Sequence, residues 1–261
     1  MFKFGADPEL FVKKNGVFVS GYGMIPGDKE NPMPVEHGAV QVDGMALEFN
    51  ILPATTEQEF LFSLEQVMKK LASMVPDYEL AISPVAEFTE EYLKQQPEKA
   101  TELGCNPDYN AWTGEQNPMP DASVSFRTGS GHIHIGWSEN EDLKSVEHTA
   151  MAFDAVKQLD FFLGLPSLFF DKDTRRRELY GKAGACRVKP YGVEYRVLSN
   201  QWLGSKSLMS WAFRSAKEGM ERLVSGEYLP GIYGDIQDII NTSDQKRAKT
   251  LLKDAGIAIP V

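Results

Sequence analysis

Residues 129–137, Gly-Ser-Gly-His-Ile-His-Ile-Gly-Trp, alternate polar and apolar side chains after a glycine-rich start. Such alternation predicts a β-strand over His132–Trp137, and side chains two residues apart in a strand point to the same face. His132 and His134 would therefore share one face, beside glycines that let a ligand approach the backbone. Two imidazoles in this position suit a metal ion or a phosphate oxygen. The alternative is two hydrogen-bonded histidines on a half-buried strand.

Turn signals place further strands on both sides of this segment. Asn15-Gly16 lies between two apolar runs, which is a strong hairpin signal, and Asp43-Gly44 joins two more runs. The predicted strands cover Phe4–Val12, Val17–Val19, Val40–Val42, Met45–Ile51, Tyr78–Ile82, Val124–Arg127 and Val193–Leu198.

Two capping boxes indicate where helices begin. Thr56–Glu59 and Ser138–Glu141 each place a glutamate three residues after a hydroxyl side chain, ahead of residues with helical apolar spacing. Pro76 ends the first of these helices, and Gly226 is a C-cap for a later one. The predicted helices cover 56–75, 138–163, 207–224 and 243–255.

The order of these elements predicts the fold class. Strands interrupted by a few helices, without regular alternation, are typical of an α+β fold with a largely antiparallel sheet. The 261 residues are enough for a large hydrophobic core, and we expect a single domain over residues 1–261. Residues 84–123 form a long segment with several prolines, of the kind often used as a lid or binding loop. A helical tail is expected from about residue 231.

The composition restricts the function. The 27 basic and 37 acidic residues give a net charge of −10, which argues against non-specific binding to nucleic acids or anionic membranes. The two cysteines can form neither a disulfide framework nor a CxxC metal site. No signal peptide is recognisable, and no apolar run approaches the ~20 residues needed to span a bilayer. We therefore expect a cytoplasmic protein.

Acidic residues occupy three other predicted strands. Asp7 and Glu9 would project from one strand face, where two carboxylates repel each other unless a cation or base lies between them; a solvated Asp-Pro turn is the alternative. Glu48 lies in an otherwise apolar strand, which also indicates a nearby cation. Glu194 and Arg196 share a strand face. They would contact a metal ion and a transferring phosphoryl group, or they form an exposed ion pair of little energetic weight.

Basic residues gather between positions 175 and 189 of this acidic chain. Arginine matches phosphate oxygens with two parallel hydrogen bonds, so a polyphosphate clamp is one interpretation and a solvated loop is the other. The chain has no GxxxxGK[ST], no GxGxxG after a strand and no GxSxG, which argues against a Walker-type nucleotide site and a serine hydrolase. The basic group comprises Arg175, Arg176, Arg177, Lys182, Arg187 and Lys189.

The order of these motifs resembles that of the glutamine-synthetase-like carboxylate–amine ligases. It is most similar to the phage-encoded COOH-NH2 ligases, the phiEco32-like amidoligase type 2. The resemblance covers about residues 1–225 and rests on Gly5–Glu9, Asp43–Asn50, Gly131–Gly136 and Glu194–Asn200. It implies a glutamine-synthetase-like catalytic fold, with a curved antiparallel sheet and flanking helices.

The resemblance also implies roles for individual residues. The metal ligands would be Glu9, Glu48, His132 and Glu194, with Asp7 as a further candidate whose side chain is shorter than the glutamate usual in the family. The ATP phosphates would meet His134, Arg177, Arg187 and Arg196. The residues implied in catalysis are Glu9, Arg187, Glu194 and Arg196.

The implied activity is ATP-dependent amide formation from a carboxylate and an amine through an acyl phosphate, with Mg²⁺ or Mn²⁺ as the cation. The substrates would be small molecules or peptides, a homo-oligomer is left open, and a phage-encoded protein would act in the host cytoplasm. Gly104–Asn110 and Arg127 are candidate substrate contacts. The alternatives are a metal-dependent hydrolase or phosphatase that uses His132 and His134, and a non-catalytic phage structural or interaction protein on the same fold.

Overall fold

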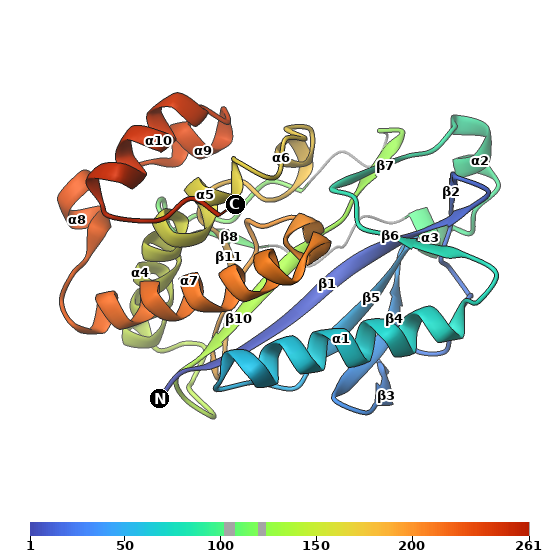
Figure 1. The fold of residues 1–261 in the computed structure, drawn as a ribbon, viewed down its shortest axis with the longest axis horizontal. Coiled ribbons are helices and arrows are strands. Elements are labelled where there is room, and N and C mark those ends of the chain that lie inside the picture. Colours follow the sequence, from blue (N-terminus) through green and yellow to red (C-terminus); the bar gives the residue numbers. More distant parts are fainter. Residues whose placement is uncertain (102–107, 120–123, 261) are drawn as a thin grey trace.

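The computed structural model describes residues 1–101, 108–119 and 124–260, and a large antiparallel sheet dominates it (Figure 1). Within these ranges the sheet has ten strands, and a separate pair is formed by β7 (Val85–Glu87) and β9 (Phe126–Thr128). β2 (Val17–Val19) and β6 (Glu79–Ala81) both pair with β1. The remaining strands follow the order β3 (Met33–Val35), β4 (Gly38–Asp43), β5 (Ala46–Ile51), β1 (Lys3–Lys14), β10 (Gly131–Gly136), β12 (Gly192–Tyr195), β11 (Ala185–Lys189) and β8 (Tyr109–Asn110).

The long strand β1 changes partners along its length. Its first half pairs with β10, so that Asp7 lies opposite His132, and Glu9 then lies opposite Glu48 of β5. Across β10, the strand β12 places Glu194 opposite His134. Residues directly opposite in an antiparallel pair point to the same face, so this register gathers polar side chains from four strands on one side of the sheet.

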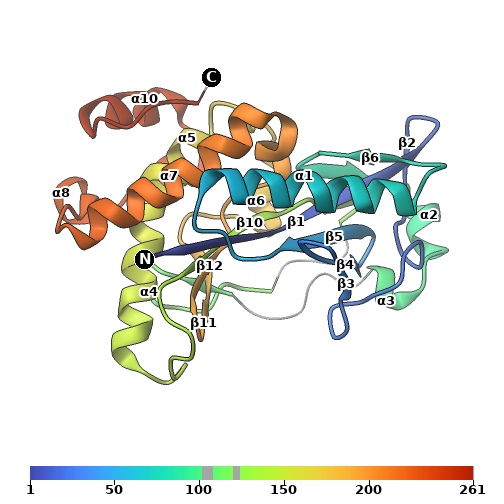
Figure 2. The ribbon, with the colours of Figure 1, turned by 60° about the horizontal axis from the view of Figure 1, so that its bottom comes forward.

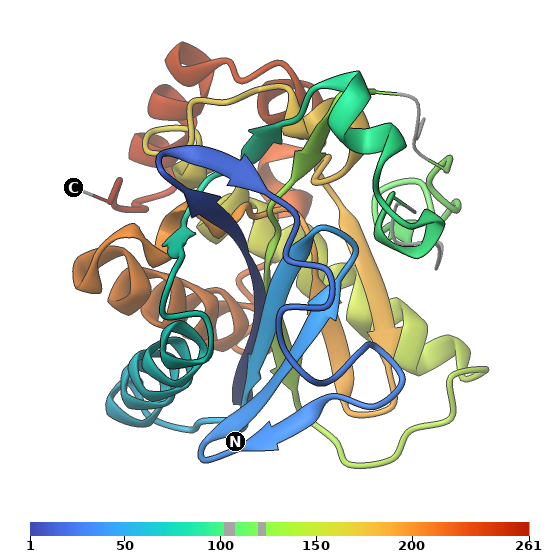
Figure 3. The same ribbon diagram turned by 90° about the vertical axis from the view of Figure 1, so that its right-hand side faces the viewer.

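Helices cover the other side of the sheet. α1 (Glu57–Met74) packs on β4 and β5, and α4 (Val146–Leu159) packs on β11 and β12. α7 (Lys206–Val224) lies between them and contacts both helices. Figure 2 shows α1 and α7 above the sheet, and in Figure 3 the same two helices lie to one side of the blue strands. The apolar residues that alternate with the polar ones, such as Ile133 and Ile135, are fully buried against this layer.

Short helical segments complete the described chain. A helical tail predicted from about residue 231 corresponds to α8, α9 and α10, which lie beyond α7 (Figure 1). Within the long segment 84–123 the structure describes β7, α2, α3 and β8. The short segments are α2 (Glu90–Lys94), α3 (Glu98–Thr101), a π-helical turn (Asp160–Gly164), α5 (Leu165–Ser167), α6 (Arg176–Leu179), a 3₁₀ turn (Asn200–Gly204), α8 (Leu229–Tyr233), α9 (Gln237–Asn241) and α10 (Gln245–Asp254).

The predicted α+β class is confirmed, with 39% helix and 24% strand. The hairpin at Asn15-Gly16 forms, and both residues have the positive φ that its turn requires. The capping box at Thr56 also forms at the start of α1. None of the helices in the described ranges is long and apolar enough to cross a membrane.

The helix start predicted at Ser138 is wrong. Ser138 donates its hydroxyl hydrogen to the Glu141 carboxylate, and the backbone N–H of Glu141 donates to the carbonyl of Pro190. This stretch is therefore tied to the β11–β12 turn and cannot form helical hydrogen bonds. The helix begins later, where the Ser145 side chain caps α4 by accepting from the His148 N–H.

Candidate functional site

The face of the sheet opposite the helices carries nearly all the side chains that the sequence singles out. They come from β5, β1, β10, β12 and β11, where polar residues alternate with the apolar residues of the core. Two groups of potential metal ligands lie on this face, each with ligand atoms within 4.8 Å of one another. The first group is Asp7, His134 and Glu194, and together with the neighbouring His132 we call it the histidine cluster. The second group is Glu9, Asp43 and Glu48, which we call the carboxylate cluster.

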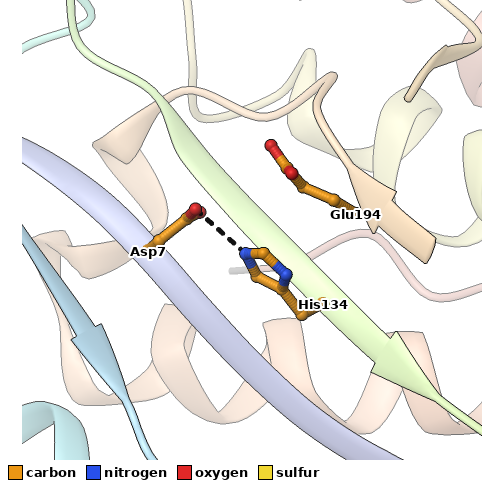
Figure 4. A group of neighbouring side chains, drawn as sticks. All are labelled: Asp7, His134 and Glu194. Atoms are coloured by element: carbon orange, nitrogen blue, oxygen red, sulfur yellow. Dashed lines mark ion pairs between the residues drawn. The ribbon is translucent and has the colours of Figure 1, made fainter. Parts of the chain in front are cut away.

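The histidine cluster is built around the Asp7 carboxylate. Its Oδ2 lies 3.0 Å from His134 Nε2 (Figure 4). Its Oδ1 lies 3.3 Å from His132 Nδ1. The Glu194 carboxylate approaches from β12, with Oε1 3.5 Å from His132 Nδ1. The ligand atoms of Asp7, His134 and Glu194 form one of the two metal-ligand groups. Tyr191 fixes the His134 ring from the other side, with its hydroxyl 2.5 Å from Nδ1.

Mutual electrostatics set the charges in this cluster. Burial raises the pKa of Asp7, but the charges of His134 and His132 outweigh it and leave that pKa far below its usual range. Burial, together with the nearby Arg196 charge, lowers the pKa of His132 to about 4. Burial opposes protonation of His134 as well, but the charge and hydrogen bond of Asp7, together with the Glu194 charge, outweigh it and raise the pKa of His134. At neutral pH Asp7 is therefore ionised and His132 is uncharged.

Three cations surround Glu194, whose side chain is only 1% exposed. Its carboxylate contacts the Arg196 guanidinium, and its oxygens lie 2.8 Å from Lys189 Nζ and 3.5 Å from Arg187 Nη1. Burial raises the pKa of Glu194, but the charges of Arg196, His132 and His134 together outweigh it and the pKa falls to about 2. Arg196 is held on its other side by Asp108, whose Oδ2 lies 3.1 Å from Nε. The face thus presents a cationic patch next to the histidine cluster.

The carboxylate cluster lies further along β1. The backbone N–H of Ser130 donates to Glu9 Oε2 at 2.8 Å, and Lys29 Nζ lies 2.7 Å from Asp43 Oδ1. Burial, reinforced by the Asp43 charge, raises the pKa of Glu9 to about 7. Burial and the charges of Asp7 and Asp43 raise the pKa of Glu48 well above its usual range. The raised pKa values of Glu9 and Glu48 show that ionisation of both beside Asp43 is unfavourable, and a bound cation would relieve this repulsion.

Of the site residues predicted from the sequence, the structure places all but Arg177 in or beside these two clusters. Arg177 is buried and donates from Nη1 to the Ser243 hydroxyl, in the turn before α10. Among the candidate substrate contacts, the Arg127 guanidinium donates to three backbone carbonyls, those of Thr101, Val124 and Phe126. Gly104 to Pro107 lie outside the described residues.

The sequence analysis did not assign Lys29, Asp43 or Tyr191 to the site. Lys29 and Asp43 enter the carboxylate cluster, and Tyr191 contacts His134. Asp108, from the segment expected to contact substrate, pairs with Arg196, and Lys189, from the basic group, pairs with Glu194. The alternation of polar and apolar residues on β4 could have identified Asp43 as a site residue. Asp43 shares a face of β4 with Gln41, and Gln41 pairs with Glu48. Lys29 and Asp108 come from loops and carry no comparable pattern.

A buried aspartate on the helix side supports the strand that carries Glu194. Asp160 lies in the π-helical turn after α4 and is completely buried. Its carboxylate accepts hydrogen bonds from the Tyr195 hydroxyl at 2.8 Å and from Trp112 Nε1 at 2.7 Å. Tyr195 lies between Glu194 and Arg196, so Asp160 anchors their strand from beneath. Burial raises the pKa of Asp160 to about 7.

This raised pKa predicts a pH-dependent stability. Between about pH 4 and pH 7 the folded chain holds a proton on Asp160 that the unfolded chain has lost, so the free energy of unfolding falls as the pH rises. The loss has an upper limit of about 4 kcal/mol. In Asp160→Asn this contribution is absent, and the stability difference between wild type and variant should shrink over that range. Denaturant titrations between pH 5 and pH 8 measure the free energy of unfolding of both proteins, with the exposed Asp77→Asn as a control. If wild type and Asp160→Asn lose stability in parallel as the pH rises, the raised pKa of Asp160 is wrong.

The comparison with protein families reaches the strands that carry much of the site. Residues 110–225 match the family model of the phage phiEco32-like COOH.NH2 ligases, type 2. The predicted resemblance is confirmed over this range. The name of this ligase family indicates an enzyme that joins a carboxylate to an amine. A search of curated proteins found no match.

The range matched to the phiEco32-like ligases contains β10, β11 and β12. It therefore includes the histidines, the cationic patch and Glu194. Asp7, Glu9 and Glu48 precede the matched range, on β1 and β5, and join the site through the pairing of β1 with β10 and β5.

Proposed function

We propose that the chain is an ATP-dependent carboxylate–amine ligase that forms an amide bond through an acyl phosphate. The observation that carries the proposal is the arrangement on the face of the sheet opposite α1, α4 and α7. Two groups of cation ligands lie side by side on β1 and its neighbours, and Arg187, Lys189 and Arg196 lie at one end of them. The ligase family matched over residues 110–225 supports the same reaction class.

The donor atoms fit divalent cations of the Mg²⁺ type. One set consists of carboxylate oxygens from Glu9, Asp43 and Glu48, and the other combines Asp7 and Glu194 with one imidazole. Mg²⁺ prefers carboxylate and phosphate oxygens, and Mn²⁺ accepts the same oxygens together with an imidazole nitrogen. The family resemblance implies His132 as the metal ligand and His134 as a phosphate contact. We assign His134 as the ligand instead, because its Nε2 faces Asp7 while Tyr191 holds its other nitrogen.

ATP would place its phosphates between the two clusters and the cationic patch. Bound cations would spread the charge that develops on the phosphate oxygens during transfer. Arg196 and Arg187 would contact the same oxygens, since guanidinium groups match phosphate geometry. Both guanidinium groups face Glu194, which keeps them in position on the sheet.

The reaction has two displacement steps. In the first, a carboxylate oxygen of one substrate attacks the γ-phosphorus, the bond from that phosphorus to the bridging oxygen breaks, and ADP leaves. In the second, the amine nitrogen attacks the carbonyl carbon of the acyl phosphate, the carbon–oxygen bond to phosphate breaks, and phosphate leaves. The proton lost from the nitrogen passes to a carboxylate of the site. Arg196 stabilises the phosphoryl group as its charge moves, a contribution typically worth about 10²- to 10³-fold in rate.

A hydroxylamine trap tests the proposal. With ATP, Mg²⁺ and a panel of carboxylates, hydroxylamine should capture the acyl phosphate as a hydroxamate, with one ADP released for each hydroxamate. A chain that binds ATP should also unfold at a higher temperature when Mg²⁺ and ATP are present, because ligand binding stabilises the native state.

Other outcomes would identify the alternatives. Hydrolytic activity without ATP, together with zinc or manganese in the purified protein, would indicate the metal-dependent hydrolase or phosphatase. The absence of both thermal stabilisation and ADP release across the panel would indicate a non-catalytic protein and would overturn the ligase proposal.

A further inference from the structure

Lys29 places the chain's own cation against the carboxylate cluster. This residue lies in the loop between β2 and β3, and its Nζ is 2.7 Å from Asp43 Oδ1. Its ammonium also attracts the carboxylates of Glu9 and Glu48. The Lys29 side chain is 49% exposed, whereas that of Asp43 is only 17% exposed. A flexible, solvent-accessible cation therefore neutralises a group of carboxylates that are themselves largely shielded from water.

The loop holds the Lys29 backbone in a fixed place beside the cluster. Gly27 has a φ of +96°, and a Cβ there would lie 2.7 Å from both Met33 N and Val40 O, so only glycine fits. The carbonyl of Gly27 accepts a hydrogen bond from the N–H of Val42, which joins the loop to β4. Asp28 Oδ1 accepts from the N–H groups of Glu30 and Asn31 and closes the turn around Lys29. The backbone is thus anchored, while the half-exposed side chain can turn toward solvent.

An ammonium and a divalent cation cannot both occupy this position favourably. The ligand atoms of Glu9, Asp43 and Glu48 lie within 4.8 Å of one another, and Lys29 Nζ touches the Asp43 carboxylate. A doubly charged ion on the same oxygens would lie a few ångströms from the ammonium and repel it. The ion therefore has to replace the Lys29–Asp43 ion pair rather than add to it.

We propose that Lys29 is a tethered competitor of the divalent cation at the carboxylate cluster and determines how readily that cation binds. This inference rests on the proposed function, which assigns a cation to this cluster. In the cation-free state Lys29 balances the charge of the carboxylates. When the cation binds, the Lys29 side chain moves off Asp43 into solvent, and the free energy of the lost ion pair weakens the binding.

Manganese binding to Lys29→Met tests the proposal without any activity measurement. Methionine keeps the length of the apolar side chain and removes the charge. Bound Mn²⁺ is counted from the loss of the free-ion electron paramagnetic resonance signal, and the unfolding temperature is followed over the same titration. We expect Lys29→Met to lower the half-saturating Mn²⁺ concentration at the carboxylate cluster by about fivefold, the upper end of the range for a partly exposed ion pair.

Three matched variants make the result specific. Lys29→Arg retains the charge and should bind Mn²⁺ like the wild type. Lys206→Met removes a surface lysine that pairs with Glu65 at 3.2 Å and should also leave binding unchanged. Adding Glu48→Gln to Lys29→Met should abolish the gain, because it removes a ligand of the carboxylate cluster. Lys29→Gln replaces Lys29→Met if the methionine variant does not fold.

The outcomes separate this proposal from the proposed function. If the wild type binds Mn²⁺ and the uncharged Lys29 variants bind it equally well or less well, the competitor role is wrong while the cation site stands. If neither the wild type nor any Lys29 variant binds Mn²⁺, the cation assignment itself is wrong. Tighter binding that survives Glu48→Gln would also overturn the proposal, because the gain would then come from another place.

Discussion

Glu194→Gln is expected to lower ATP turnover by about a thousandfold, the upper end of the range for loss of a single electrostatic contact in a catalytic site. The glutamine keeps the shape of the side chain but loses the charge that would bind a cation together with Asp7 and His134. It also releases Arg196, Arg187 and Lys189 from the carboxylate that positions them. Release of ADP in the presence of an accepted carboxylate measures the effect.

The same substitution should destabilise the fold. Glu194 is almost completely buried, and removing one partner of a buried ion pair costs about 3 kcal/mol or more because the other charges stay uncompensated. Turnover is therefore measured well below the unfolding temperature of the variant. Glu87→Gln is the matched control, since Glu87 is an exposed carboxylate that pairs with Arg175 outside both clusters. Wild-type ADP release by a folded Glu194→Gln would show that this carboxylate is not needed for the reaction.

Glu9→Gln is expected to separate activity from stability. The glutamine oxygen can still accept from the Ser130 N–H, but the carboxylate cluster loses one anionic ligand, and turnover should fall by about a hundredfold or more. Stability should change in the opposite direction. Because the folded-state pKa of Glu9 is raised to about 7, ionising it costs stability as the pH rises through that value. At pH 8 the variant avoids this cost and should unfold at a higher temperature than the wild type.

Measurements at two pH values check the Glu9 result. The gain in unfolding temperature should be larger at pH 8 than at pH 5, where the wild-type carboxyl is protonated. Equal gains at both values would contradict the raised pKa. Wild-type turnover by Glu9→Gln would show that the carboxylate cluster does not depend on Glu9.

The strands and their faces could be predicted because both depend on local alternation. Asp7 with Glu9 and His132 with His134 were expected to share faces from their spacing alone, and the register of β1 and β10 brings the two pairs together. Helix starts were less certain, because the same capping pattern occurs at Thr56 and at Ser138 and only Thr56 caps a helix. The backbone bonds from residues 137–141 to the β11–β12 turn, which involve residues distant in the sequence, decide the difference.

The basic run 175–177 shows why a charge pattern in the sequence does not by itself locate a functional site. Arg175 pairs with Asp173 and Glu87, Arg176 donates to the carbonyl of Val197, and Arg177 donates to Ser243. Neighbouring residues of this short helical stretch point in different directions, so three similar side chains have three different environments. The sequence shows that the run is basic, but only the tertiary contacts decide whether one of its guanidinium groups reaches the site.

The exchange of partners along β1 has a consequence for how this protein can change over evolutionary time. Asp7 and Glu9 serve different clusters from one continuous strand, so the backbone itself sets their separation at about 7 Å, two residues of extended chain. A residue inserted or deleted between them would turn one carboxylate toward the hydrophobic core. Descendants of this gene can therefore vary in the length of their loops, but the spacing of one residue between these two acids has to be inherited intact.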